Sequence, residues 1–72
     1  MTDYRPSQSA DYAQYAEAKL IALRRHAVYE IASDTTGNID PRPMIALQEA
    51  IEVIRRIRSD EEAMANEGQY QV

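Results

Sequence analysis

The fold of this chain follows from two stretches: DYAQYAEAKLIALRRHAVYEIAS, residues 11–33, and PRPMIALQEAIEVIRRIRSDEEAM, residues 41–64. In each stretch the apolar residues recur every three or four positions, so they share one side of an α-helix. The first stretch is rich in alanine and also contains Glu17, Lys19 and Leu20, all of which favour helix. The sequence therefore predicts two amphipathic helices, at about residues 10–33 and 41–65.

A single hydrophobic core is expected between these helices. A chain of 72 residues allows one domain and is of the size at which one core is only marginally sufficient. Small alanines in the first stripe permit close approach of a second helix. The large aliphatic residues expected in the core are Leu20, Ile21, Leu23, Val28, Ile31, Met44, Leu47, Ile51, Val53, Ile54 and Ile57.

The helix ends are marked by turn and capping residues. Asp11 with Gln14 three positions later is a capping pair for the first helix. The segment SDTTGNID, residues 33–40, contains residues that bond their own backbone or tolerate positive φ. Asp40 can then cap the second helix, and Pro41 suits its first position. These signals separate the two helices by a short turn.

The sequence thus predicts an all-α fold, a two-helix hairpin with flexible termini. Residues 1–9 are expected to form a flexible arm, residues 10–66 a single helical domain and residues 67–72 a flexible tail. Two such hairpins can also close into a four-helix bundle, and the sequence leaves that association open.

Composition narrows the class of protein. The chain has no cysteine, so it offers neither a disulfide nor a thiolate metal site. Its apolar runs are far below membrane-spanning length, and residues 1–10 lack the basic start and apolar run of a signal peptide. We therefore expect a cytoplasmic protein with no membrane contact.

No residue pattern indicates catalysis, a cofactor or a metal. His26 has Glu30 one helical turn later, but no nucleophile elbow or triad accompanies this pair. The alternating oxygen-bearing side chains of residues 34–40 suggest a calcium loop. That loop requires glycine and glutamate where the chain has Ile39 and Ile45. The sequence predicts a protein that is not an enzyme, with a simple turn at this position.

An outward set on the first helix is the main candidate for binding another protein. Tyr15 and Tyr29 lie opposite the apolar stripe if the helix is regular, and Arg25 and His26 flank them. Tyrosine and arginine are the side chains that most often anchor protein interfaces. Two alternatives stay open: exposed tyrosines are ordinary on surfaces, or a rotated helix would turn these rings toward a second core edge.

Further candidates lie on the second helix and in the arm. Arg55, Arg56 and Arg58 form the densest basic cluster, and Tyr4 and Arg5 are available for terminal contacts. Local ion pairs, which have little functional meaning, also account for this cluster. The acids at suitable spacing are Glu52, Glu61 and Glu62.

The opening MTDYRPSQ, residues 1–8, and an acidic, cysteine-free helical body rich in alanine and arginine carry a resemblance. The chain resembles small phage-encoded regulators that bind bacterial host RNA polymerase and inhibit initiation or promote antitermination. The resemblance is one of overall type along the whole chain, so it assigns no role to a particular residue. It implies a non-enzymatic protein that occupies polymerase surface without a cofactor.

Two other functions are compatible with the same residues. One is a self-associating structural or assembly module, or an inhibitor of another host protein. The other is a weak nucleic-acid binder, which the net charge of −4 disfavours because such binding rests on clustered cations. The residues available to it are Arg24, Arg25, Arg55, Arg56 and Arg58.

Overall fold

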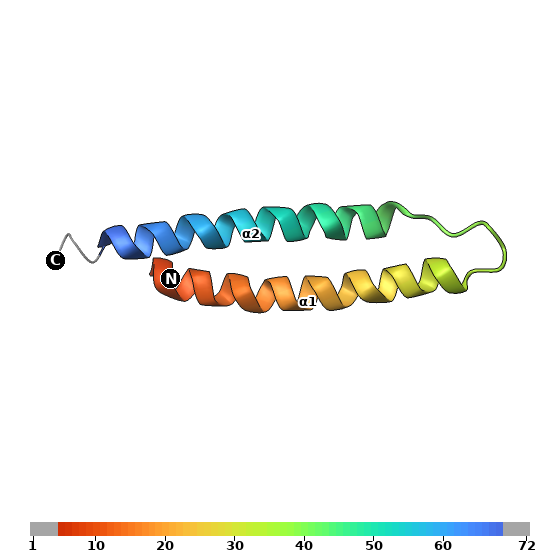
Figure 1. Cartoon of the computed structure of the whole chain (residues 1–72), viewed down its shortest axis with the longest axis horizontal. Helices are drawn as coiled ribbons and strands as arrows, with labels where there is room; N and C mark the ends of the chain where they lie inside the picture. The colour runs from red at the N-terminus through yellow and green to blue at the C-terminus, as the bar shows by residue number, and fades with distance from the viewer. Residues whose placement is uncertain (1–4, 69–72) are drawn as a thin grey trace, which may run out of the picture.

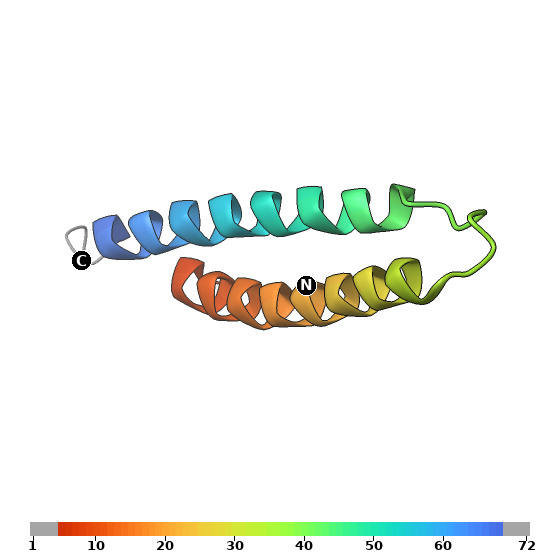
Figure 2. The same cartoon turned by 45° about the vertical axis from the view of Figure 1, so that its right-hand side comes forward.

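The computed structural model describes residues 5–68 of the chain. Within that range the chain forms two α-helices, α1 (Pro6–Ser33) and α2 (Arg42–Gly68). They run antiparallel, side by side, and residues 34–41 connect them at one end (Figures 1 and 2). The predicted all-α hairpin is confirmed.

Helix α1 begins at Pro6, about four residues earlier than predicted. Proline fixes φ at a helical value and has no N–H to satisfy, so it suits the first helical position. Gln8 Oε1 accepts the backbone N–H of Arg5 at 3.2 Å, and the Ser9 N–H donates to the Arg5 carbonyl at 3.0 Å. Residues 6–9 are therefore helical and not part of an arm.

The predicted capping pair of the first helix, Asp11 with Gln14, lies inside α1 and not at its start. Because the helix starts at Pro6, the residue before it is Arg5, and the Gln8 side chain accepts the Arg5 N–H. The Arg5 guanidinium has donors only, so it cannot return the bond as a serine or aspartate would.

The connection is held by Asp34, the residue that follows α1. Its carboxylate accepts the Thr36 hydroxyl at 2.7 Å, the Thr36 N–H at 3.3 Å and the Gly37 N–H at 2.8 Å. Gly37 has φ of 72°, in the left-handed region that a residue without Cβ enters at no steric cost. The Asp34 side chain thus stabilises the reversal of the chain by bonding residues of the connection itself.

Helix α2 begins at Arg42, one residue later than predicted. Asp40 Oδ1 accepts the Arg42 N–H at 3.0 Å, and the Asp40 carboxylate also binds the Arg42 guanidinium at 2.8–2.9 Å. The Pro41 carbonyl accepts the N–H groups of Met44 and Ile45. Helix α2 ends at Gly68, about three residues later than predicted, so residues 67–68 belong to the helix and not to a tail. The rest of the predicted tail, residues 69–72, lies outside the described residues.

The core is narrower than predicted. Among the described residues only Ala10, Ala13 and Ile51 are buried, and Ile51 is the one large side chain with no exposed surface. Two helices meet along a single seam, which is narrower than the apolar stripe of either helix. Six other residues that the sequence placed in the core are half-buried. They are Leu20, Ile21, Ile31, Met44, Leu47 and Ile54.

Four of the side chains expected in the core are exposed instead. Leu23, Val28, Val53 and Ile57 keep 41–54% of their surface in contact with solvent. They lie beside the seam and not in it, so the opposite helix covers only one side of each. In a hairpin without a third layer these positions have no further element to pack against.

Candidate functional site: the surfaces of the hairpin

Polar contacts occupy part of the seam. The Glu17 side chain is only 13% exposed and accepts Arg55 Nε at 2.9 Å and Arg58 Nη1 at 3.0 Å. Arg58 also approaches Glu62 at 3.7 Å, one turn later in the same helix. Arg55 therefore pairs across the hairpin with Glu17 and not with the acids near it in sequence. Only the Arg58–Glu62 pair corresponds to the local pairing that the sequence suggested.

Arg24 lies in the same seam and binds Gln48. Its Nη1 donates to Gln48 Oε1 at 2.8 Å, in a partly buried contact. Arg24 is seven residues after Glu17, and Gln48 is seven residues before Arg55, so both contacts repeat at the heptad interval of a coiled coil. These two contacts specify the register of α1 against α2, because sliding either helix by one turn breaks both.

Three carboxylates have lowered pKa values for local reasons. The hydrogen bond from Arg55, with the charges of Arg58 and Arg55, lowers the pKa of Glu17 below its ordinary value of 4.5, against partial burial. The bonds from Thr36 lower the pKa of Asp34 below 3.8, and those from Arg42 do the same for Asp40. Each of these carboxylates is bonded in the ionised form.

We expect the hairpin to lose stability in acid. The unfolded carboxyls take up protons at their ordinary pKa values, before the folded ones do, so acid favours the unfolded chain. Above about pH 5.5 the ionised carboxylates contribute their full stabilisation to the folded hairpin. This stabilisation is lost as the pH falls through the ordinary pKa values of 4.5 and 3.8 toward the lower pKa values of the folded chain. Thermal unfolding followed by circular dichroism from pH 7 to pH 3 measures this. Glu17→Gln should be less stable at pH 7 and should lose less on acidification.

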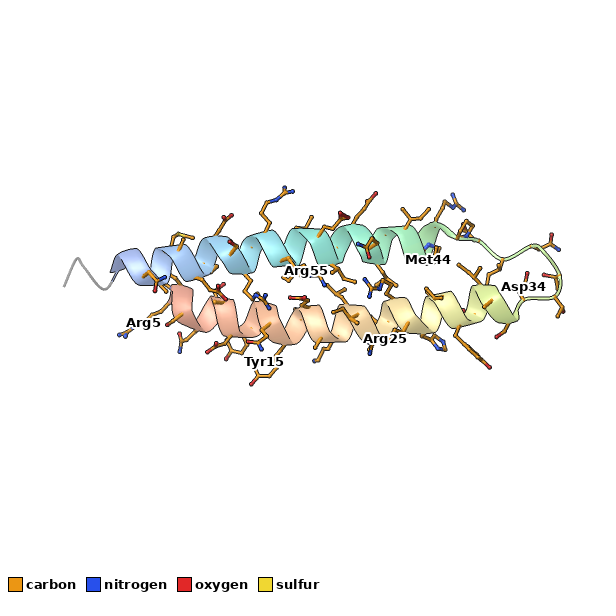
Figure 3. All side chains as sticks on the ribbon, viewed as in Figure 1. Arg5, Tyr15, Arg25, Asp34, Met44 and Arg55 are labelled. Atoms are coloured by element: carbon orange, nitrogen blue, oxygen red, sulfur yellow. The ribbon has the colours of Figure 1, made fainter. Side chains whose placement is uncertain are left out.

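The predicted tyrosine set lies on one outer face of α1. Tyr15 is 68% exposed and Tyr29 67% exposed, and His26 and Arg25 are exposed beside them. Figure 3 shows Tyr15 and Arg25 on the side of α1 that faces away from α2. We call Tyr15, Arg25, His26 and Tyr29 the outer face of α1. The alternative in which these rings cover a second core edge is thereby wrong for the hairpin.

The basic residues divide into engaged and unengaged groups. Arg24, Arg55 and Arg58 are bonded across the seam, whereas Arg25 and Arg56 are exposed and have no carboxylate within 4.0 Å among the described side chains. His26 Nε2 contacts Glu30 Oε1 at 2.6 Å. Of the cations predicted to bind a protein, Arg25 is the one that combines an unpaired charge with the tyrosine pair.

The other predicted contacts lie apart from the outer face of α1. Arg56 belongs to α2, where it is exposed. Arg5 is exposed at the N-terminal end of α1, and Tyr4 is outside the described residues. The structure therefore groups only four of the predicted residues into one surface.

A second surface, missed in the sequence, lies along one flank of the hairpin. Tyr12, Ala16 and Ile57 line one shallow hollow between the helices. Leu23 follows Ala16 by two turns of α1, so it lies on the same side. Val53 precedes Ile57 by one turn, and Met64 follows Ile57 by two. We call this surface the apolar flank, and its exposed large members are Tyr12, Leu23, Val53, Ile57 and Met64.

The opposite flank is mixed in character. Val28 and Ile45 share its hollow with Arg24, Gln48, and the carboxylates of Glu49 and Glu52. The two flanks therefore have different chemistry, although both contain half-exposed aliphatic side chains. The heptad spacing of Ala16 and Leu23, and of Ile57 and Met64, was the sequence signal that could have revealed the apolar flank.

The described residues contain no cluster of three or more histidine, cysteine, aspartate or glutamate side chains that could hold a metal ion. Neither of the described helices is long and apolar enough to cross a membrane. What the surfaces offer chemically is apolar area, aromatic rings and guanidinium groups, which are the means of binding another macromolecule.

Comparison with known proteins gives no relative: no protein-family model matches the chain, and neither a curated protein nor a solved structure matches it significantly.

Proposed function

We propose that this chain is a small, non-enzymatic regulator that acts by binding another protein through the outer face of α1. The observation that carries the proposal is the placement of Tyr15, Arg25 and Tyr29 on one exposed side of a long helix, with Arg25 unpaired. Tyrosine rings and a guanidinium bury large area and keep a polar tip that can be satisfied in the complex.

The structural role of the other arginines supports this assignment. Arg24, Arg55 and Arg58 already have partners across the seam, so the hairpin uses them for its own register. Arg25 makes no such contact among the described side chains, and neither tyrosine is needed to cover the core. The outer face of α1 is thus available to a partner at no cost to the fold.

The same distribution weighs against nucleic acid. Three of the five arginines available to such a function are bonded within the hairpin, and the other two, Arg25 and Arg56, lie on different helices. Phosphate neutralisation needs a cluster or track of free cations. The described surface offers separated charges instead.

Bacterial RNA polymerase is the partner that we propose, from the resemblance to small phage-encoded regulators. Binding there would regulate transcription by occupying polymerase surface, and no cofactor is needed for that action. The proposal places the chain in the host cytoplasm, where the polymerase is found.

The outer face is tested by binding of the chain to purified bacterial RNA polymerase, measured by biolayer interferometry. Tyr15→Ala/Tyr29→Ala should weaken binding by at least about tenfold, because truncating an interface anchor costs more than about 1.4 kcal/mol. Arg25→Ala should also weaken it. Arg56→Ala, a matched loss of an exposed arginine on α2, should have little effect.

Two results would go against these proposals. Undiminished binding by the tyrosine double variant would move the contact to another surface. Absence of any binding by the unmodified chain would remove polymerase as the partner, and affinity capture from a bacterial lysate with the same variants would then test the outer face against other proteins.

A further inference from the structure

We infer that a second copy of this chain covers the apolar flank, so that two hairpins form a four-helix bundle. Self-association of this kind goes beyond the proposed function and does not depend on it. The outer face of α1 points away from the seam and lies to the side of the apolar flank, so it stays accessible in such a bundle.

The two flanks differ in how many charged residues line them. Tyr12, Leu23, Val53, Ile57 and Met64 expose 41–59% of their surface, and the hollow in the apolar flank has no charged residue in its lining. The hollow on the opposite flank is lined by an arginine and two glutamates as well as Val28 and Ile45. A half-exposed aliphatic residue is ordinary in isolation, but a row that extends over both helices indicates a surface that is normally covered.

The core of the hairpin is small. Within the described residues Ile51 is the only large side chain that is fully buried. In chains of this size a single core rarely contributes more than about 3–5 kcal/mol, and small proteins supplement it with disulfides, a metal or association. This chain has no cysteine, and its described residues contain no metal-binding cluster. Association with a second copy supplies the missing layer.

The available area is sufficient for that association. The chain exposes 5951 Å², whereas a compact monomer of its mass exposes roughly 4,500 Å². A standard protein interface covers about 800 Å² of each partner. The excess exposed by the hairpin is therefore larger than one such interface requires.

The positions of the apolar residues along the hairpin favour a second copy over an unrelated partner. The Glu17–Arg55 and Arg24–Gln48 contacts place Ala16 of α1 level with Ile57 of α2, and both line the hollow of the apolar flank. A two-fold axis parallel to the helices places α1 of one copy against α2 of the other at the same level. The small Ala16 of one hairpin then meets the large Ile57 of its twin, and all neighbouring helices are antiparallel.

The experiment compares matched substitutions on the two flanks by sedimentation equilibrium from about 1 to 200 µM. Leu23→Glu and Val53→Glu alter the apolar flank. Val28→Glu and Ile45→Glu place the same charge on the opposite flank, at side chains of similar type and exposure. The unmodified chain and the opposite-flank variants should be dimers. The apolar-flank variants should have dissociation constants raised by at least about 100-fold, because each charge enters the interface twice.

Folding is monitored in the same samples. Far-ultraviolet circular dichroism should show that all four variants stay helical, since these side chains are half exposed in the hairpin. The melting temperature of the unmodified chain should rise with concentration, as for any dimer. If an acidic variant loses its helices, Leu23→Ala and Val53→Ala replace it and should raise the dissociation constant by about tenfold.

Two outcomes would overturn the inference: a chain that is monomeric at 200 µM, or equal effects of the substitutions on both flanks. If the chain is monomeric and Leu23→Glu abolishes polymerase binding, the dimer is wrong and the polymerase covers the flank. The tyrosine variants then decide whether the polymerase also contacts the outer face of α1. If the chain is dimeric but the outer-face variants leave every protein contact unchanged, the proposed function fails while the dimer stands.

Discussion

Ile51→Ala is expected to lower the free energy of unfolding by about 2–5 kcal/mol, more than any other single alanine substitution in the hairpin. Ile51 is the only large side chain in the described residues with no exposed surface. Its removal leaves a cavity in the middle of the seam, where the backbones of two long helices cannot easily close in. Domains are stabilised by only about 5–15 kcal/mol in total, so this loss is a large part of the whole.

Urea unfolding followed by circular dichroism at 222 nm measures this effect at a fixed chain concentration, because association contributes to stability. Ile45→Ala is the matched control, since it removes the same atoms from a side chain that is 50% exposed on the same helix. Its expected cost is within about 0.5–1 kcal/mol. Equal losses for the two variants would show that the seam is not packed as described.

Glu17→Lys is expected to have the second largest effect, a fall of the melting temperature by several degrees. In the folded hairpin Glu17 is 13% exposed and accepts bonds from both Arg55 and Arg58. Reversing its charge removes both bonds and places a third cation beside two arginines. The lysine must either tolerate this repulsion or leave the seam, and each response separates the helices near the N-terminal half of α1.

Glu30→Lys is the control for this substitution. Glu30 is also on α1 and also contacts a basic side chain, His26, but the contact is local and both side chains are more than half exposed. Its effect on the melting temperature should be small. Charge exchange gives a second check: Arg55→Glu combined with Glu17→Lys should recover part of the loss. A double variant less stable than Glu17→Lys would argue against a direct Glu17–Arg55 pair.

The apolar pattern predicted the two helices well because local periodicity and capping residues act within one helix. Pro41 and Asp40 marked the start of α2 to within one residue, and its end at Gly68 is about three residues later than predicted. The start of α1 was missed because the residue before the helix, Arg5, is not one of the side chains that usually cap a helix, and Gln8, inside the helix, accepts its N–H instead.

The buried set was predicted less well. An amphipathic stripe shows which residues avoid water, but it does not show how many helices are present to cover them. With one partner helix the seam buries Ala10, Ala13 and Ile51 and leaves Leu23 and Val53 half exposed. The same residues that sequence placed in a core therefore become a candidate association surface.

The candidate binding residues were divided by contacts that are distant in sequence. Tyr15, Arg25 and Tyr29 could be placed outward from the helical period alone. Arg55 could not be assigned, because Glu17, its partner, is in the other helix. No local rule distinguishes an arginine with a partner across the hairpin from one that is available to another molecule.

Interactions between near neighbours in the chain are enough to specify two long helices joined by a tight turn, since helical period, proline, glycine and capping side chains act over a few residues. The packing of α1 against α2 determines the rest: which side of each helix is covered, how Glu17 and Arg24 specify the register, and which apolar residues stay in contact with water. Burial and ion pairing depend on groups that come together only when the chain has folded back on itself.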